Sequence, residues 1–167
     1  MITVKDSQLR KAAHEGIDAF LGLIIEAIKE KSQHEINADT LSLLNGNQIT
    51  LWAYDILRDE VMNGGFIQLI YNGYGPFIFD NPFAKAMRLW GLKDLSKLVY
   101  KAKELYDENK GALTQEYSDE EFMALFEQYP QFDDLDDSFI ENEEEYTERI
   151  ARYVDEHLND FISIEND

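Results

Sequence analysis

The negative charge of this chain is confined to its second half, where it alternates with large apolar residues. Residues 1 to 103 contain 12 Asp or Glu and 12 Lys or Arg, whereas residues 104 to 167 contain 22 acids and three bases. An acidic segment with few apolar residues would stay disordered. Here the apolar residues recur among the carboxylates, so this half can pack a core while its charge faces water. They include Phe122, Phe126, Tyr129, Phe132, Phe139, Tyr146, Tyr153, Phe161 and Ile162.

Apolar residues follow helical spacing along most of the chain. This spacing predicts long amphipathic helices over residues 6 to 30, 49 to 61 and 95 to 109, and a last helix whose inward face runs from Tyr146 to Ile162. Hints of strands are confined to residues 61 to 77 and to FISI near the end of the sequence. We therefore expect an all-α fold, a single-domain helical bundle of about six to eight helices with little or no sheet.

Several residues mark where the shorter helices should begin and end. Pro82 suits the first turn of a helix that Gly91 ends, and Ser118 is expected to cap another helix. Asn142 and Glu145 have the spacing of a capping box, which places the start of the last helix near residue 142.

The uncharged stretch VMNGGFIQLIYNGYGPF, residues 61 to 77, contains two Asn-Gly pairs. Asn-Gly pairs on either side of a short apolar run are typical of a β-hairpin. The central FIQLIY does not alternate, however, and Phe66, Leu69 and Ile70 share one helical face. We predict a short buried helix between two turns, the first of which ends the preceding helix, with a hairpin as the alternative.

Length and composition limit the organisation of the chain. With 167 residues we expect one domain over residues 1–167, in which 1–45 form an N-terminal helix and connection and 46–160 form the helical core. There is no cysteine for a disulfide or a thiolate metal site. The longest apolar run, residues 19 to 28, is too short to cross a bilayer. A soluble cytoplasmic protein is expected.

Motifs for catalysis or for cofactor binding are missing from the sequence. The three histidines are far apart, and none forms a helical pair of zinc ligands. Phe139 stands where a calcium-binding loop starting at Asp134 would need glycine. No complete phosphate-binding glycine motif occurs either. The sequence therefore predicts no catalytic residue, no metal and no cofactor.

The densest group of carboxylates lies between residues 133 and 148, a segment without any base. As a helix it would extend roughly 24 Å at about 1.5 Å per residue, so a pair of such segments would approach the charge density of duplex DNA. A basic partner would be attracted by this field, although a merely solvated face is the alternative. The candidate binding residues are Asp133, Asp134, Asp136, Asp137, Glu141, Glu143, Glu144, Glu145 and Glu148.

A stripe of lysines contrasts with this acidic segment. Lys93, Lys97 and Lys101 are spaced by four residues, opposite the apolar face of their helix. They form either a solvated face or a contact with an acidic segment of a second subunit.

Three segments together resemble a small bacterial family of mostly unassigned function. They are DEVMNGGFIQLIYNGYG (59 to 75), AMRLWGL (86 to 92) and FDDLDDSFIENEEEYTERIARYVDEH (132 to 157), and the resemblance covers roughly residues 50 to 160. The family pattern centres on an N-G-G-F-x-Q motif and a later Leu-Asp pair. The matching positions are Asn63, Gly64, Gly65, Phe66, Gln68, Tyr71, Asn72, Gly75, Gly91, Leu135 and Asp136.

The resemblance implies a dimeric α-helical protein, because the described member of this family is a dimeric DNA-mimic protein. It implies a non-enzymatic partner for a basic DNA-binding protein, such as a transcriptional regulator or a nucleoid protein, with no direct nucleic-acid binding and no membrane contact. The motif from Asn63 to Gly75 carries no charge. It therefore identifies the fold, while the acidic segment would carry the activity.

Two other functions are compatible with the same sequence. An immunity-type inhibitor would block the basic active cleft of a nuclease toxin, with an apolar interface that survives high salt. An enzyme would instead place a carboxylate site in a pocket near Asn63, Gln68 and Asn72.

Overall fold

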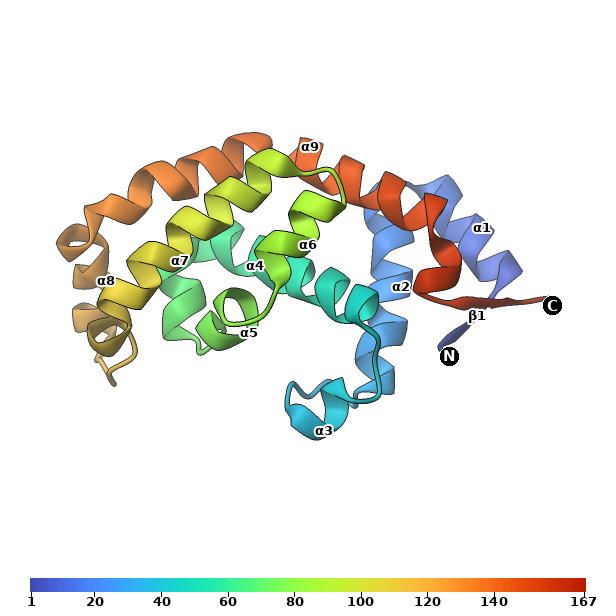
Figure 1. Cartoon of the computed structure of the whole chain (residues 1–167), viewed down its shortest axis with the longest axis horizontal. Coiled ribbons are helices and arrows are strands. Elements are labelled where there is room, and N and C mark those ends of the chain that lie inside the picture. The colour runs from blue at the N-terminus through green and yellow to red at the C-terminus, as the bar shows by residue number, and fades with distance from the viewer. The chain divides into compact units, whose positions relative to one another are not determined.

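The computed structural model describes all 167 residues as nine α-helices, two short 3₁₀ turns and a sheet of two strands (Figure 1). The predicted all-α class is confirmed. The chain divides into unit 1, residues 1–55 with 147–167, and unit 2, residues 56–146. The expected single domain over 1–167 stays a prediction. None of the helices combines the length and apolar character needed to cross a lipid bilayer.

Unit 1 is built from both ends of the chain. It contains β1 (Thr3–Lys5), α1 (Asp6–Glu15), α2 (Ile17–Lys31), α3 (Ala38–Leu41), the start of α4 (Gly46–Tyr71), the end of α9 (Asp133–Glu156), the turn η2 (Leu158–Asp160) and β2 (Ser163–Glu165). The two strands are parallel, with Thr3 opposite Ser163 and Lys5 opposite Glu165. The hint of a strand in FISI is thus confirmed, whereas β1, in which buried Val4 lies between exposed Thr3 and Lys5, was not expected.

Polar side chains hold the start of α4 to the C-terminal segment within unit 1. The Gln48 amide donates to the Phe161 carbonyl at 2.7 Å, and the Asn45 amide donates to the Asp160 carbonyl at 2.9 Å. The hydroxyls of Tyr54 and Thr147 are 2.8 Å apart, and both side chains are buried. Because buried polar groups are costly when unpaired, these hydrogen bonds fix how the segments join.

The single helix predicted over residues 6 to 30 is wrong, since Gly16 divides it into α1 and α2. Gly16 has φ 131° and ψ 179°, which only glycine adopts without strain. The apolar spacing continues across this break and therefore conceals it. Gly16 is also where the two helices turn to pack against each other.

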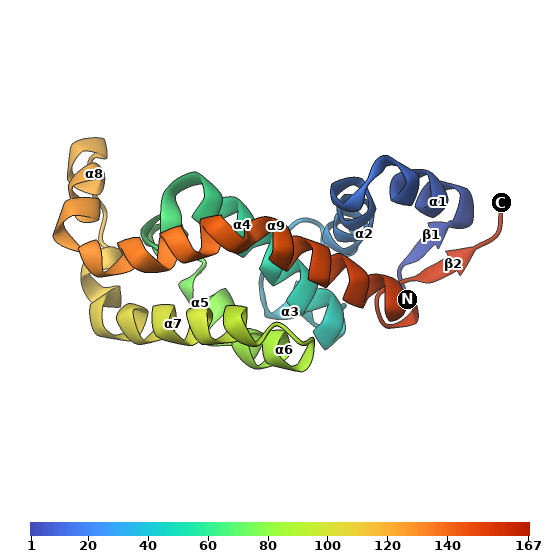
Figure 2. The ribbon, with the colours of Figure 1, turned by 90° about the horizontal axis from the view of Figure 1, so that it is seen from above.

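Unit 2 holds the central part of the chain and its own core. It contains the rest of α4, α5 (Gly75–Phe79), α6 (Phe83–Leu89), α7 (Lys93–Leu113), α8 (Asp119–Gln128), the turn η1 (Pro130–Phe132) and the first half of α9. Figure 2 shows α8 leading into the start of α9 through this turn. Its fully buried side chains include Phe66, Ile67, Leu69, Ile70, Phe132 and Phe139.

Helix boundaries in unit 2 agree only partly with the sequence. Ser118 caps α8, as predicted, and it forms a capping box with Glu121. The predicted start of the last helix at Asn142 is wrong, because α9 already begins at Asp133. Asn142 instead donates to the Ser138 carbonyl one turn earlier, at 2.8 Å, inside this helix.

The N-G-G-F segment forms a break within α4. Gly64 and Gly65 have non-helical dihedral angles, and the chain then continues as a short buried helix to Tyr71. The predicted helix between turns is therefore confirmed, and the β-hairpin alternative is wrong.

The conformation of Gly16 predicts opposite effects for one substitution at two glycines of unit 1. Gly16→Ala should lower the free energy of unfolding by about 1 to 3 kcal/mol, because φ 131° strains any other residue. Gly22→Ala should raise it by up to about 1 kcal/mol, because Gly22 lies inside α2 with open space at its Cβ position. Urea unfolding of both variants measures the difference. Equal effects would contradict the role assigned to Gly16.

Candidate acidic binding surface

All nine candidate carboxylates lie on one helix. The segment from 133 to 148 is helical throughout, so these residues follow one another along α9 at about 1.5 Å per residue. Residues 111 to 148 contain 14 acids and no Lys or Arg. We call this segment, whose only charged residues are acids, the acid-only stretch; it also includes α8. Acids in the first turns of both helices are stabilised by the helix dipoles, which partly offsets their mutual repulsion.

The helix sorts its carboxylates into two groups. Two of them, Asp136 and Glu143, turn inward: Asp136 is half-buried and Glu143 is buried. The other seven are exposed to solvent, and we call them the outer acids. They are Asp133, Asp134, Asp137, Glu141, Glu144, Glu145 and Glu148.

The outer acids form a regular row. Asp133, Asp137, Glu141 and Glu145 are spaced by four residues, so neighbouring members are about 6 Å apart along the helix axis. Glu148, which belongs to unit 1, pairs with Arg152 at 3.2 Å on an exposed turn. Exposed pairs of this kind contribute little to stability and can be exchanged for a partner's cation.

Asp136 is bound to the break in α4. Its Oδ1 accepts a hydrogen bond of 2.8 Å from the backbone N–H of Phe66. The same carboxylate occupies the space that a side chain at Gly65 would need, and Gly65 has φ 75°. The first N–H groups of a helical segment lack partners within it, so Asp136 caps the helix that restarts at Phe66.

Burial raises the pKa of Asp136 from its ordinary value of 3.8 to about 6. The Phe66 N–H opposes this change by stabilising the carboxylate, while the neighbouring charges of Asp133 and Asp137 add to it. A group whose folded-state pKa is raised contributes stability at low pH, and that contribution is lost as the pH rises towards 6. Asp136 therefore belongs to the interior of unit 2 and not to its charged surface.

Glu143 has a cation as its partner. Arg58 Nε lies 2.5 Å from Glu143 Oε1, and this pair joins α4 to α9 within unit 2. A buried carboxylate needs such a partner because its desolvation is costly. Like Asp136, Glu143 holds α9 in place.

The remaining polar residues of the motif bind one another. Glu60 Oε2 accepts hydrogen bonds from the amides of Gln68 and Asn72, both at 2.9 Å, and Asn63 donates to Gln68 at 3.3 Å. Gly75 begins α5 beside the ring of Tyr106. These amides thus connect the two sides of the break in α4, which is a structural role.

No group of three or more His, Asp or Glu side chains is arranged to hold a metal ion. An open pocket of about 350 Å³ lies within unit 1, with Ile17, Phe20, Ala151 and Arg152 in its lining. It contains none of the motif residues.

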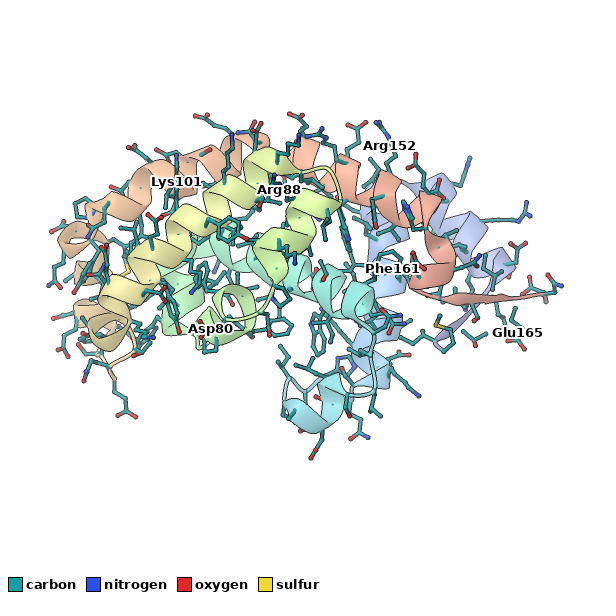
Figure 3. All side chains as sticks on the ribbon, viewed as in Figure 1. Asp80, Arg88, Lys101, Arg152, Phe161 and Glu165 are labelled. Carbon is teal, nitrogen blue, oxygen red and sulfur yellow. The ribbon has the colours of Figure 1, made fainter.

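Three lysines of α7, Lys93, Lys97 and Lys101, are exposed and form no ion pair. Lys93, Lys97 and Lys101 lie on the outer face of the helix, as their spacing predicts. Figure 3 shows Lys101 on α7 and Arg88 on the preceding helix α6. Contact of these lysines with a second subunit stays a prediction.

A family model described as DMP19-like protein matches residues 42–157. The matched region includes the break in α4, the outer acids and both ends of the hydrogen bond between Phe66 and Asp136. The chain belongs to the DMP19-like family. It is similar to the DNA mimic protein DMP19 of Neisseria meningitidis serogroup B (strain ATCC BAA-335 / MC58), with 32% identity over 148 residues, 87% of this chain and 88% of that relative.

Membership of the DMP19-like family confirms the resemblance found in the sequence. Both strands, β1 and β2, lie outside the matched residues. Sequence reasoning did not separate Asp136 and Glu143 from the outer acids. It also did not identify Arg58 as the partner of Glu143, or Glu60 as the acceptor for Gln68 and Asn72. Asp136 and Glu143 lie three residues before and four after Phe139, so helical spacing would have placed them on the inward face.

The raised pKa of Asp136 predicts a pH-dependent difference between the parent protein and Asp136→Asn. The parent should lose stability relative to the variant as pH rises from about 4 to about 6, because only the parent must ionise a half-buried carboxyl. Urea unfolding at a series of pH values measures this. Asp136→Ala, which also removes the acceptor for Phe66, should be less stable than Asp136→Asn by about 1 to 3 kcal/mol. A difference between parent and Asp136→Asn that stays constant with pH would contradict the assignment.

Two adjacent glutamates should respond differently to the same substitution. Glu143→Gln should lower the free energy of unfolding by about 1 to 3 kcal/mol, because it removes the charge paired with Arg58. Glu144→Gln should change it by less than about 0.5 kcal/mol, because Glu144 is exposed. Chemical denaturation of both variants at neutral pH provides the comparison, and a larger loss for Glu144→Gln would show that the inward and outer acids are wrongly assigned.

Proposed function

We propose that this protein is a non-enzymatic, cytoplasmic binding protein that occupies a basic DNA-binding protein, such as a transcriptional regulator, in place of nucleic acid. The outer acids of α9 are the proposed binding surface. Asp136 and Glu143, which the sequence included in this surface, support it from inside. The protein itself is proposed to bind no nucleic acid, and a homodimer would present two such surfaces.

The observation that carries the proposal is the row of exposed carboxylates on α9, most of which lie in a stretch of the chain that contains no Lys or Arg. Seven acids of α9 face solvent, and no Lys or Arg occurs between residues 111 and 148. Lys and Arg side chains that bind phosphates would experience a similar field here, which steers association over roughly a Debye length, about 8 Å at physiological salt. Regular intervals of about 6 Å along a rigid helix keep these charges in place.

The related protein supports the same function. The relative from Neisseria meningitidis is named a DNA mimic protein, and it covers most of this chain. A mimic of this kind needs a negative surface held on a stable scaffold. The contacts of Asp136 and Glu143 supply the scaffold, while the outer acids supply the charge.

The test compares two triple variants that each remove three negative charges. The first, Asp137→Asn, Glu141→Gln and Glu144→Gln, neutralises outer acids. It should weaken binding to a captured DNA-binding protein by on the order of tenfold or more, because each lost ion pair contributes up to about 1 kcal/mol. It should also flatten the dependence of binding on salt. Isothermal titration with the purified partner, and competition with the DNA of that partner, measure both effects.

The control variant is Asp39→Asn, Glu15→Gln and Glu30→Gln, which removes three exposed acids from unit 1. It should bind nearly as well as the parent. Equal weakening by both variants would mean that net charge alone matters, and unchanged binding of the first variant would contradict the proposed surface. Tight capture of a single nuclease that persists at high salt would support the immunity-type alternative instead.

A further inference from the structure

Two large apolar side chains are exposed within the acid-only stretch of residues 111 to 148. Met123 on α8 is 64% exposed and Ile140 on α9 is 46% exposed. Both belong to unit 2. Single exposed apolar residues are common on protein surfaces and need no explanation. What these two share is their surroundings.

Met123 is surrounded by carboxylates along its helix. Asp119 lies four residues before it, Glu120 three residues before it and Glu127 four residues after it, and all three are exposed. Residues at these intervals are neighbours on a helix surface. Met123 therefore forms the apolar centre of an acidic face of α8.

Ile140 has the same surroundings on α9. Asp137 lies three residues before it and Glu144 four residues after it, both outer acids, and Glu141 follows it directly. Its neighbours on the inward side, Asp136 and Glu143, are bound to α4. Ile140 is thus the apolar centre of the row of outer acids.

Aromatic rings pack on the inner side of α8, the helix that carries Met123. Phe122 and Phe126 are half-buried, and the ring of Phe122 stacks on that of Tyr71 with centroids 4.6 Å apart. Phe126 meets Phe122 edge-on at 5.4 Å. The remaining side of α8 faces water, since Leu125 is its only buried residue. Met123 therefore projects from a helix whose other side is packed with aromatic rings.

We propose that Met123 and Ile140 are apolar anchors that bury themselves in the basic partner, while the carboxylates around them pair with its Lys and Arg. This proposal rests on the proposed function. An apolar centre within a charged rim is the usual anatomy of a protein interface. A DNA-binding surface also carries apolar groups among its cations, because it must contact thymine methyl groups in the major groove. The side chains of Met123 and Ile140 can pack against these apolar groups, which carboxylates cannot do.

The two kinds of contact differ in their response to salt. Ion pairs of the outer acids weaken as the Debye length falls from about 8 Å at about 0.15 M to about 3 Å at about 1 M salt. Contacts of Met123 and Ile140 should persist, because burial of apolar surface does not depend on charge. The part of binding that remains at high salt is therefore the measure of the anchors.

The experiment uses two synthetic helical peptides as probes. They have equal length and equal numbers of lysines. On the face that contacts the protein, the positions not taken by lysine are leucine in one peptide and serine in the other. Fluorescence anisotropy measures their affinity for the full-length parent, for the double variant Met123→Ala with Ile140→Ala, and for Leu89→Ala. Leu89 is the control because it is 73% exposed on α6, outside the acid-only stretch.

At about 1 M salt the parent should retain the leucine peptide and release the serine peptide. The double variant should bind the leucine peptide on the order of tenfold less tightly, and its affinity for the serine peptide at low salt should change less than about twofold. Leu89→Ala should behave as the parent. A second double variant, Met123→Gln with Ile140→Gln, should lose affinity for the leucine peptide to the same extent. Circular dichroism of each variant checks that it is folded.

The proposed role of Met123 and Ile140 would be contradicted if the parent and both double variants bound the leucine peptide with equal affinity. It would also be contradicted if Leu89→Ala lost as much affinity for this peptide as the double variants do. The proposed function fails differently. It would be contradicted if the triple variant of outer acids bound the serine peptide at low salt as tightly as the parent does, whatever the leucine peptide shows.

Discussion

The hydrogen bond from the backbone N–H of Phe66 to Asp136 is the contact on which the arrangement of unit 2 depends. It provides an acceptor for the first backbone N–H of the helix that restarts after the break in α4, and it holds the first turns of α9 against that break. Gly65 leaves room for the carboxylate, which no other residue would allow. The two parts of the family pattern, N-G-G-F and the later Leu-Asp pair, are therefore the two sides of one interaction.

Once Asp136 is held inward, the periodicity of the helix decides where every other carboxylate of α9 points. Glu143 falls on the same side, where Arg58 neutralises it, and the outer acids fall on the opposite side. Phe139 and Tyr146 are buried on the inward side as well, so the inward acids and the apolar face fix the rotation of this helix together. The inward acids thus help to orient the outer ones, although they contribute nothing to the exposed surface.

Helical spacing was sufficient to predict the fold class and most of the helices, because each helix buries one apolar face. It failed where a break or a start leaves that spacing intact: Gly16 interrupts a continuous stripe, and α9 begins among aspartates that are as common in turns as at helix ends. The acidic surface was visible in the composition. The contact between Phe66 and Asp136 was not, since nothing in one sequence links positions seventy residues apart.

Unit 1 is made of the first and the last segments of the chain, joined by the parallel pairing of β1 and β2. Unit 2 is topologically an insertion into it. During synthesis all of unit 2 therefore leaves the ribosome before unit 1 receives its second segment, and domains generally fold as units in the order in which they emerge. The helix that carries the outer acids begins in the unit that can fold first and ends in the one that must wait.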